Sequence, residues 1–180
     1  MTTKERFVKF MELMENGMGY KAAKSLLEKL YLRGFFECPA STKYHGNYPG
    51  GLFDHSFAVT ESLIKLTDSL NLEWERKDSP YIVGMLHDLC KCDQYTLTLD
   101  DKYEYVPNLP LPGHGEKSVI LAQLVLDRPL TGEEILCIRW HMGAFDDKSN
   151  WGSYGSAIET FENVLWTHTA DMMASRIQGV

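Results

Sequence analysis

Residues 85–91 read Met-Leu-His-Asp-Leu-Cys-Lys (MLHDLCK), and this stretch places two adjacent polar groups, His87 and Asp88, in an otherwise apolar segment. Burying an imidazole beside a carboxylate is costly unless something compensates them. A divalent metal ion between the two side chains would be such a compensation, because neutral imidazole and carboxylate both bind divalent cations. The stretch therefore predicts a buried metal centre within a helical fold.

Further residues of metal-ligand type lie on both sides of this stretch, each about one helical hairpin beyond the last. They are His55, His114, His141 and Asp171. Because the order suggests convergence on one centre, we expect them to meet His87 and Asp88 there. A histidine taken alone on an apolar helix is more often a hydrogen-bonded core residue, so the prediction depends on the whole set.

Composition limits the class of protein and of partner. A chain of 180 residues, 44% of them hydrophobic, is long enough for one domain with a core. The formal net charge of −7 offers no broad positive field, which favours a small molecule over long nucleic acid as partner. The charged N-terminal sequence and the lack of a long apolar run favour a cytoplasmic protein without a membrane segment, whose four cysteines are free thiols.

Apolar residues at helical spacing predict an all-α fold. Ser79 is expected to cap the helix that starts at Pro80 and carries His87, Asp88 and Lys91. Capping-box patterns that begin at Thr131 and Ser156 are expected to open the last two helices. The predicted helices cover about residues 3–16, 20–33, 52–70, 80–91, 114–126, 131–141 and 156 to near the C-terminus.

Two connecting segments carry their own signals. Residues 94–106 alternate with period two and predict a small β-hairpin around Asp100-Asp101. Its Tyr95, Tyr103 and Tyr105 are expected to form a packed face rather than a base-stacking platform. Residues 143–155 are polar and rich in glycine, and they predict a loop suited to a mobile lid.

Lys91 and His45 are candidate catalytic residues. Lys91 follows Asp88 by three residues, so on a helix it shares the same face and could reach a phosphate oxygen. His45 precedes the Gly50-Gly51 pair in a loop and is a candidate proton donor or substrate contact, with an ordinary loop histidine as an equal alternative.

Three further basic residues lie near the candidate ligands in the sequence. His168, one turn before Asp171, is expected to support the ligands or pack in the core rather than bind metal. Arg139 and Lys117 could bind phosphate, but a place on the surface is the expectation for both.

The segments that carry these residues resemble the HD-domain superfamily of metal-dependent phosphohydrolases. The similarity covers residues 45–175 and looks closest to the HD domain of bacterial 3′–5′ exoribonucleases. No segment within these 180 residues is similar to their nucleic-acid-binding barrel, so we expect a small substrate rather than a polynucleotide. The segments are similar, in order, to those of the family's first histidine, its eponymous His-Asp pair, its third and fourth histidines and its closing aspartate: GGLFDHS (50–56), MLHDLCK (85–91), GHGEKS (113–118), RWHMG (139–143) and ADMMAS (170–175).

The resemblance implies an HD-domain bundle of about six or seven helices with one small β-hairpin, in a single metal-binding domain (1–180) with an N-terminal helical extension (1–34). It implies one or two divalent transition-metal ions (Mn, Fe, Co, Ni or Zn) and no organic cofactor. The implied ligands are His55, His87, Asp88 and Asp171 for the first ion, and His114 and His141 for a second ion bridged by Asp88.

The implied function is hydrolysis of a phosphate mono- or diester of a nucleotide or short oligonucleotide by metal-bound hydroxide. The implied catalytic residues are Asp88, Lys91 and His45, and a homodimer is left open. The same ligand order also resembles the di-iron oxygenases of this superfamily, and Lys91 favours the hydrolase. A non-catalytic binding module is a third hypothesis, but such a module has no need of an open metal site.

Overall fold

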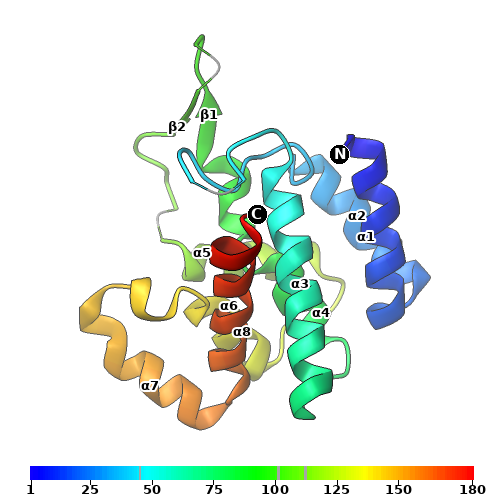
Figure 1. Ribbon diagram of the computed structural model, residues 1–180, viewed down its shortest axis with the longest axis vertical. Helices are drawn as coiled ribbons and strands as arrows, with labels where there is room; N and C mark the ends of the chain where they lie inside the picture. The colour runs from blue at the N-terminus through cyan, green and yellow to red at the C-terminus, as the bar shows by residue number, and fades with distance from the viewer. Residues whose placement is uncertain (45, 101, 112) are drawn as a thin grey trace.

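The computed structural model describes residues 1–44, 46–100, 102–111 and 113–180, and within them the fold is all-α with one small hairpin, which confirms the predicted fold class (Figure 1). Strands β1 (Tyr95–Leu97) and β2 (Tyr103–Tyr105) pair antiparallel, with Tyr95 opposite Tyr105. The α-helices are α1 (Thr3–Met18), α2 (Tyr20–Leu32), α3 (Gly51–Leu70), α4 (Ser79–Leu86), α5 (Gly115–Val125), α6 (Gly132–Trp140), α7 (Trp151–Thr160) and α8 (Asn163–Met172).

Helices α3 and α8 run side by side through the centre of the molecule, with α1 and α2 on one flank and α7 on the other (Figure 1). One buried apolar cluster takes side chains from all eight helices, among them Phe10, Leu30, Phe53 and Val164. Residues 1–34 thus pack on the rest of the described chain, while the single-domain boundary itself stays a prediction. None of the helices in the described ranges is both long and apolar enough to cross a membrane.

A buried ion pair joins α1 to the start of α3. The Arg6 guanidinium donates from Nε to Asp54 Oδ1 at 2.9 Å and from Nη2 to Asp54 Oδ2 at 3.0 Å. Both side chains are nearly inaccessible to solvent. Gly50 lies against this guanidinium, where a Cβ atom would come within 2.2 Å of Arg6 Cζ, and its φ of +82° also favours glycine. The pair fixes the helix that carries His55 against the N-terminal helix.

The start of α6 is held by the fully buried Glu134. The predicted capping box is present, because Thr131 Oγ1 accepts from the Glu134 backbone N–H and Glu134 Oε2 accepts from the Thr131 N–H. The same carboxylate accepts from both Nη atoms of Arg128, at 2.7 and 2.8 Å, and from Ser79 Oγ at 2.8 Å. Burial opposes ionisation, but these donors, Arg128 first, hold the pKa of Glu134 below its usual value.

Replacing Glu134 with glutamine is therefore expected to lower the free energy of unfolding by about 2 kcal/mol at pH 7, since Arg128 loses its charged acceptor. The pKa of Glu134 is lower in the folded chain than the value of about 4.3 in an unfolded one. The stability that ionised Glu134 contributes is thus complete above the unfolded-state pKa, and it is lost as the pH falls through the pKa of the folded state. Urea denaturation should show the difference at pH 7 and a smaller one below pH 4, with the exposed Glu159→Gln as control. An equal difference at both pH values would contradict this.

The predicted helix through Lys91 is wrong in its second half. The α-helix ends at Leu86, and after His87 the backbone of Asp88 takes φ −107° and ψ 19° before a 3₁₀ turn, η1 (Leu89–Asp93). The predicted Ser79 cap is also wrong, because the Ser79 hydroxyl donates to Glu134 and Asp78 is the N-cap residue. Long-range polar partners, which the local pattern does not contain, decide both features.

The predicted loop over residues 143–155 is mostly helical. Two 3₁₀ turns, η2 (Gly143–Phe145) and η3 (Lys148–Asn150), lead into α7, which begins at Trp151. Ser156 lies inside α7 and donates to the Gly152 carbonyl oxygen at 3.1 Å, so it caps no helix, and α8 begins at Asn163 instead. A long lid and a Ser156 capping box were therefore wrong predictions.

Candidate metal centre

Six side chains that the sequence marks as metal ligands meet at one place in the interior. Four come from the turns directly beside helix ends, and the other two come from the long helix α3 and from the last turn of α8. The three histidines at positions 55, 87 and 141 are fully buried. The six residues are His55 on α3, His87 and Asp88 after α4, His114 before α5, His141 after α6 and Asp171 on α8.

The Asp88 carboxylate lies in the middle of this group. Its Oδ1 is 2.8 Å from His114 Nε2 and 3.3 Å from His141 Nε2. Its Oδ2 is 3.6 Å from the Nε2 atoms of both His55 and His87. Each oxygen thus faces a different pair of histidines, an arrangement that a carboxylate bridging two ions would have.

Asp171 and His87 complete the other side of the centre. Asp171 Oδ1 is 3.2 Å from His55 Nε2, and the Nε2 atoms of His55 and His87 are 3.3 Å apart. Ligand atoms of His55, His87 and Asp88 lie within 4.8 Å of one another, and so do those of His87, His141 and Asp171. Such groups are compact enough for a single cation to contact three ligands.

Backbone carbonyl groups orient three of the histidines. His87 and His141 occupy the same local position, directly after an α-helix, and each Nδ1 contacts the carbonyl oxygen three residues earlier, at 2.8 Å to Gly84 and 2.7 Å to Ile138. His55 Nδ1 contacts the carbonyl oxygen of Val180 at 2.9 Å. A carbonyl only accepts, so each Nδ1 carries the proton and each Nε2 presents a lone pair to the centre.

The fourth histidine, His114, is oriented by a thiol that sequence reasoning missed. Its Nδ1 lies 3.2 Å from Cys90 Sγ. Burial raises the pKa of Cys90 to about 12, so this sulfur stays protonated. Asp88, Cys90 and His114 form a further group of ligand atoms within 4.8 Å, although a protonated thiol is a poor metal ligand. Cys90 follows Asp88 by two residues in the sequence, and this nearness to a predicted ligand was the signal that could have indicated its role.

The charges of this group suit a cation. Burial lowers the pKa of His87 to about 3, so its imidazole is neutral near pH 7. Burial opposes ionisation of Asp88, but the Lys91 ammonium and the histidines hold the pKa of Asp88 well below its usual value. Burial also opposes ionisation of Asp171, but the proximity of His55, whose Nε2 lies 3.2 Å from Asp171 Oδ1, lowers the pKa of this carboxyl. His141 differs, because burial opposes its protonation but the contact with Asp88 raises its pKa, so a cation would compete with a proton there. Neutral imidazoles and ionised carboxylates are the donor set that divalent transition metals prefer.

The buried Nε2 atom of His141 supports the presence of a bound cation at this centre. His141 Nε2 is inaccessible to solvent, and although it lies 3.3 Å from Asp88 Oδ1, it makes no well-formed hydrogen bond in the described part of the chain. A buried polar atom without a partner is costly, and a bound cation would satisfy this lone pair. The residues at the centre therefore fit one or two divalent ions, while the assignment of each ligand remains a prediction.

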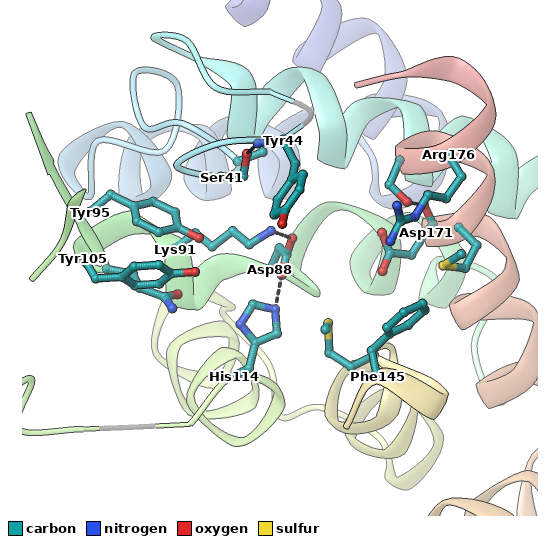
Figure 2. Close-up of a pocket in the computed structure, with 15 residues that line it drawn as sticks. Ser41, Tyr44, Asp88, Lys91, Tyr95, Tyr105, His114, Phe145, Asp171 and Arg176 are labelled. Carbon is teal, nitrogen blue, oxygen red and sulfur yellow. Dashed lines mark hydrogen bonds and ion pairs between the residues drawn. The ribbon is translucent and has the colours of Figure 1, made fainter. Parts of the chain in front are cut away.

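A cavity of about 300 Å³ opens over the Asp88 side of the centre (Figure 2). Lys91 reaches into it, and its Nζ lies 2.5 Å from Asp88 Oδ2, because the 3₁₀ turn brings the third following residue back to the same side. Tyr95 and Tyr105 of the hairpin also line it, with ring centroids 5.1 Å apart. The expected packed face is therefore formed in part, because these two rings pack against each other while Tyr105 stays 61% exposed.

Of the other basic residues singled out in the sequence, His168, Lys117 and Arg139 lie outside the six-residue ligand group. His45 falls outside the described residues. His168 Nδ1 contacts the carbonyl oxygen of His141 at 2.8 Å, as expected for a supporting residue. Lys117 is buried and paired with Asp93, so its expected surface position is wrong. It is held at the first turn of α5, where it faces η1.

Arg139 is also less exposed than expected. Its guanidinium pairs with Glu116 and Asp146, each at 2.6 Å, and lies 3.9 Å from the ring centroid of Trp140. The side chain is 15% exposed. Because its guanidinium is already paired with both carboxylates, Arg139 links α5, α6 and the following turn instead of facing the cavity.

The chain is similar to two proteins named 3′–5′ exoribonuclease YhaM: 30% identical over 155 residues to that of Shouchella clausii and 29% over 157 residues to that of a Geobacillus species. These alignments cover 84% and 83% of this chain but 46% and 45% of the relatives, so the chain spans about half their length. It is also 32% identical over 72 residues to the dihydroneopterin 2′,3′-cyclic phosphate phosphodiesterase of Methanocaldococcus jannaschii, covering 38% of this chain and 29% of that protein. No family model and no solved structure matches the chain.

Proposed function

We propose that this chain is an HD-type phosphohydrolase that uses one or two divalent transition-metal ions to cleave a phosphate ester of a nucleotide or oligonucleotide. The observation that carries the proposal is the Asp88 carboxylate set among four histidine Nε2 atoms at the floor of a cavity. The names of the relatives support it, because an exoribonuclease and a cyclic phosphate phosphodiesterase both cleave phosphodiester bonds.

In this proposal His55, His87, Asp88 and Asp171 hold one ion, and His114 and His141 hold a second that shares Asp88. The metal supplies a water molecule of lowered pKa and neutralises charge on the phosphate group. The protein's own residues orient the ligands through the Nδ1 contacts and keep solvent from the buried histidines. The single domain over residues 1–180 belongs to the same proposal.

Lys91 has a part of its own in the proposed reaction. Its ammonium lines the cavity beside Asp88, where it can donate to a phosphate oxygen as negative charge develops. His45 remains the proposed proton donor to the leaving group.

We expect Lys91→Met to lower kcat about a hundredfold, the usual loss when one donor to a developing negative charge is removed. The metal content should stay unchanged, because Lys91 is not a ligand. The measurements are the kinetics of bis(p-nitrophenyl) phosphate hydrolysis and mass spectrometric metal analysis, with the exposed Lys24→Met on α2 as control. A kcat within threefold of the unmodified protein would remove Lys91 from the mechanism.

The substrate's length is left open in this proposal. The sequence's net charge disfavoured long nucleic acid, but relatives named for RNA cleavage mean that a polymer is not excluded. Net charge is a property of the whole chain, whereas a strand needs only local contacts beside the cavity. Nothing in the described residues supports the homodimer.

An assay without oxygen tests the reaction class. The protein, freed of metal and then loaded with manganese, cobalt, nickel or iron, is expected to hydrolyse bis(p-nitrophenyl) phosphate or short oligonucleotides equally well in air and under anaerobic conditions. The named relatives are not oxygenases, so the di-iron alternative has no support from them. Turnover that requires both iron and oxygen would refute the proposal.

A further inference from the structure

The last helix changes its winding directly after the candidate ligand Asp171. Helix α8 ends at Met172 and continues as a π-helical turn, η4 (Met173–Gln178). In an α-helix of 3.6 residues per turn, Arg176 would lie about 140° around the axis from Asp171. In the wider π turn, with its i→i+5 bonding, the fifth residue returns towards the face of the first. Both side chains consequently line the same cavity (Figure 2).

Among the described residues that line the cavity, one lysine and one arginine carry positive charge, and they differ in whether that charge is paired. Lys91 is buried and paired with Asp88 at 2.5 Å. Arg176 is exposed and makes no ion pair with any described residue. Its guanidinium lies 5.7 Å from the ring centroid of Phe145, which also lines the cavity. Contact with a ring face leaves the N–H groups of a guanidinium free to bind an anion.

An anionic substrate would meet two carboxylates, Asp88 and Asp171, in this cavity. The proposed metal ions would offset these carboxylates, and Lys91 is already paired with Asp88, so Arg176 is the cationic side chain of the described lining that is left to pair with further phosphate oxygens. In the view of Figure 2, Lys91 and Arg176 lie on opposite sides of Asp88, with Arg176 near Asp171. A planar guanidinium fork matches two oxygens of one phosphate group, whereas an ammonium acts as a point charge.

We propose that Arg176 binds a phosphate group of the substrate on the side of the metal centre opposite Lys91. The π-helical turn directs the Arg176 side chain towards that position. This inference rests on the proposed function, which it extends from a reaction class to a substrate-binding residue. Because Arg176 contacts the substrate from the cavity rim and not the buried ligands, it contributes to binding more than to the chemical step.

The test uses the metal-loaded 180-residue chain with Arg176→Gln, Arg176→Lys and, as a control for the lost charge, Lys24→Gln on α2. Calorimetry measures the Kd of inorganic phosphate, and bis(p-nitrophenyl) phosphate hydrolysis gives kcat and KM. We expect Arg176→Gln to weaken phosphate binding and to raise KM about tenfold each, with kcat within threefold and metal content unchanged. Arg176→Lys should recover part of the phosphate affinity, because it keeps the charge but loses the fork.

Phosphate affinity and KM within twofold of the unmodified protein in both variants would overturn the inference. A tenfold fall in kcat at unchanged KM would also overturn it, since it would place Arg176 in the chemical step. The two proposals can fail separately. A protein that cleaves no phosphate ester, yet binds phosphate tenfold more tightly with Arg176 than with glutamine, would refute the proposed function and support the anion site.

Discussion

Asp88→Asn is expected to remove the bound metal and to lower phosphodiester turnover by at least about a thousandfold, the largest effect on activity of any substitution considered. All four histidine Nε2 atoms lie between 2.8 and 3.6 Å from this carboxylate. An amide is isosteric with the carboxylate but carries no charge, so an ion would lose its bridging anion while the shape of the site is kept. The Lys91 ammonium would also be left unpaired beside the ion.

Metal content by mass spectrometry, turnover of bis(p-nitrophenyl) phosphate and the circular dichroism spectrum together check this expectation. Asp68→Asn, an exposed position on α3, serves as the matched control. Loss of metal with an unchanged spectrum would separate the effect from unfolding. Full metal content and turnover in Asp88→Asn would remove Asp88 from the centre and with it the proposed function.

The largest loss of stability is expected from Arg6→Met. Methionine would leave the Asp54 carboxylate buried without its counter-ion, which costs about 3–5 kcal/mol in the free energy of unfolding. Urea denaturation measures this, with Lys4→Met on the same helix as the exposed control. The double variant Arg6→Met with Asp54→Asn should lose less than the sum of the single variants, because it leaves no unpaired charge. Additive losses would show that the two residues act independently.

Residues with a strong periodic pattern let the sequence predict most of the fold. Phe10 and Leu26 lie on apolar faces of 3.6-residue period, and α1, α2 and α3 begin and end within about two residues of the predicted bounds. The alternation around Tyr95 and Tyr105 similarly gave the hairpin. Thr131 and Glu134 carry a complete local capping signal. The convergence of His55 with Asp171 was predicted from the spacing of residues of metal-ligand type, about one helical hairpin apart, and from the family resemblance.

Features that depend on distant partners were not predictable. Arg6 and Asp54 are 48 residues apart, and no local pattern pairs them. The pattern of MLHDLCK continues as a helix, whereas the chain leaves the α conformation at Asp88 to meet four histidines. Arg176 faces the cavity only because the helix widens, and a π turn has no signal in MASRIQ that distinguishes it from an α-helix.

The matching positions of His87 and His141 have one more consequence. Each follows the last residue of an α-helix, so the carbonyl ends of α4 and α6 both face the centre. These ends carry partial negative charge from the helix dipole, which adds to the two aspartates around an interior space. Without a bound cation, repulsion between these negative charges destabilises the folded chain, whereas in the unfolded chain the charges are far apart and hydrated. Occupancy by a cation and resistance to unfolding are therefore thermodynamically linked, and the melting temperature should follow the free metal concentration.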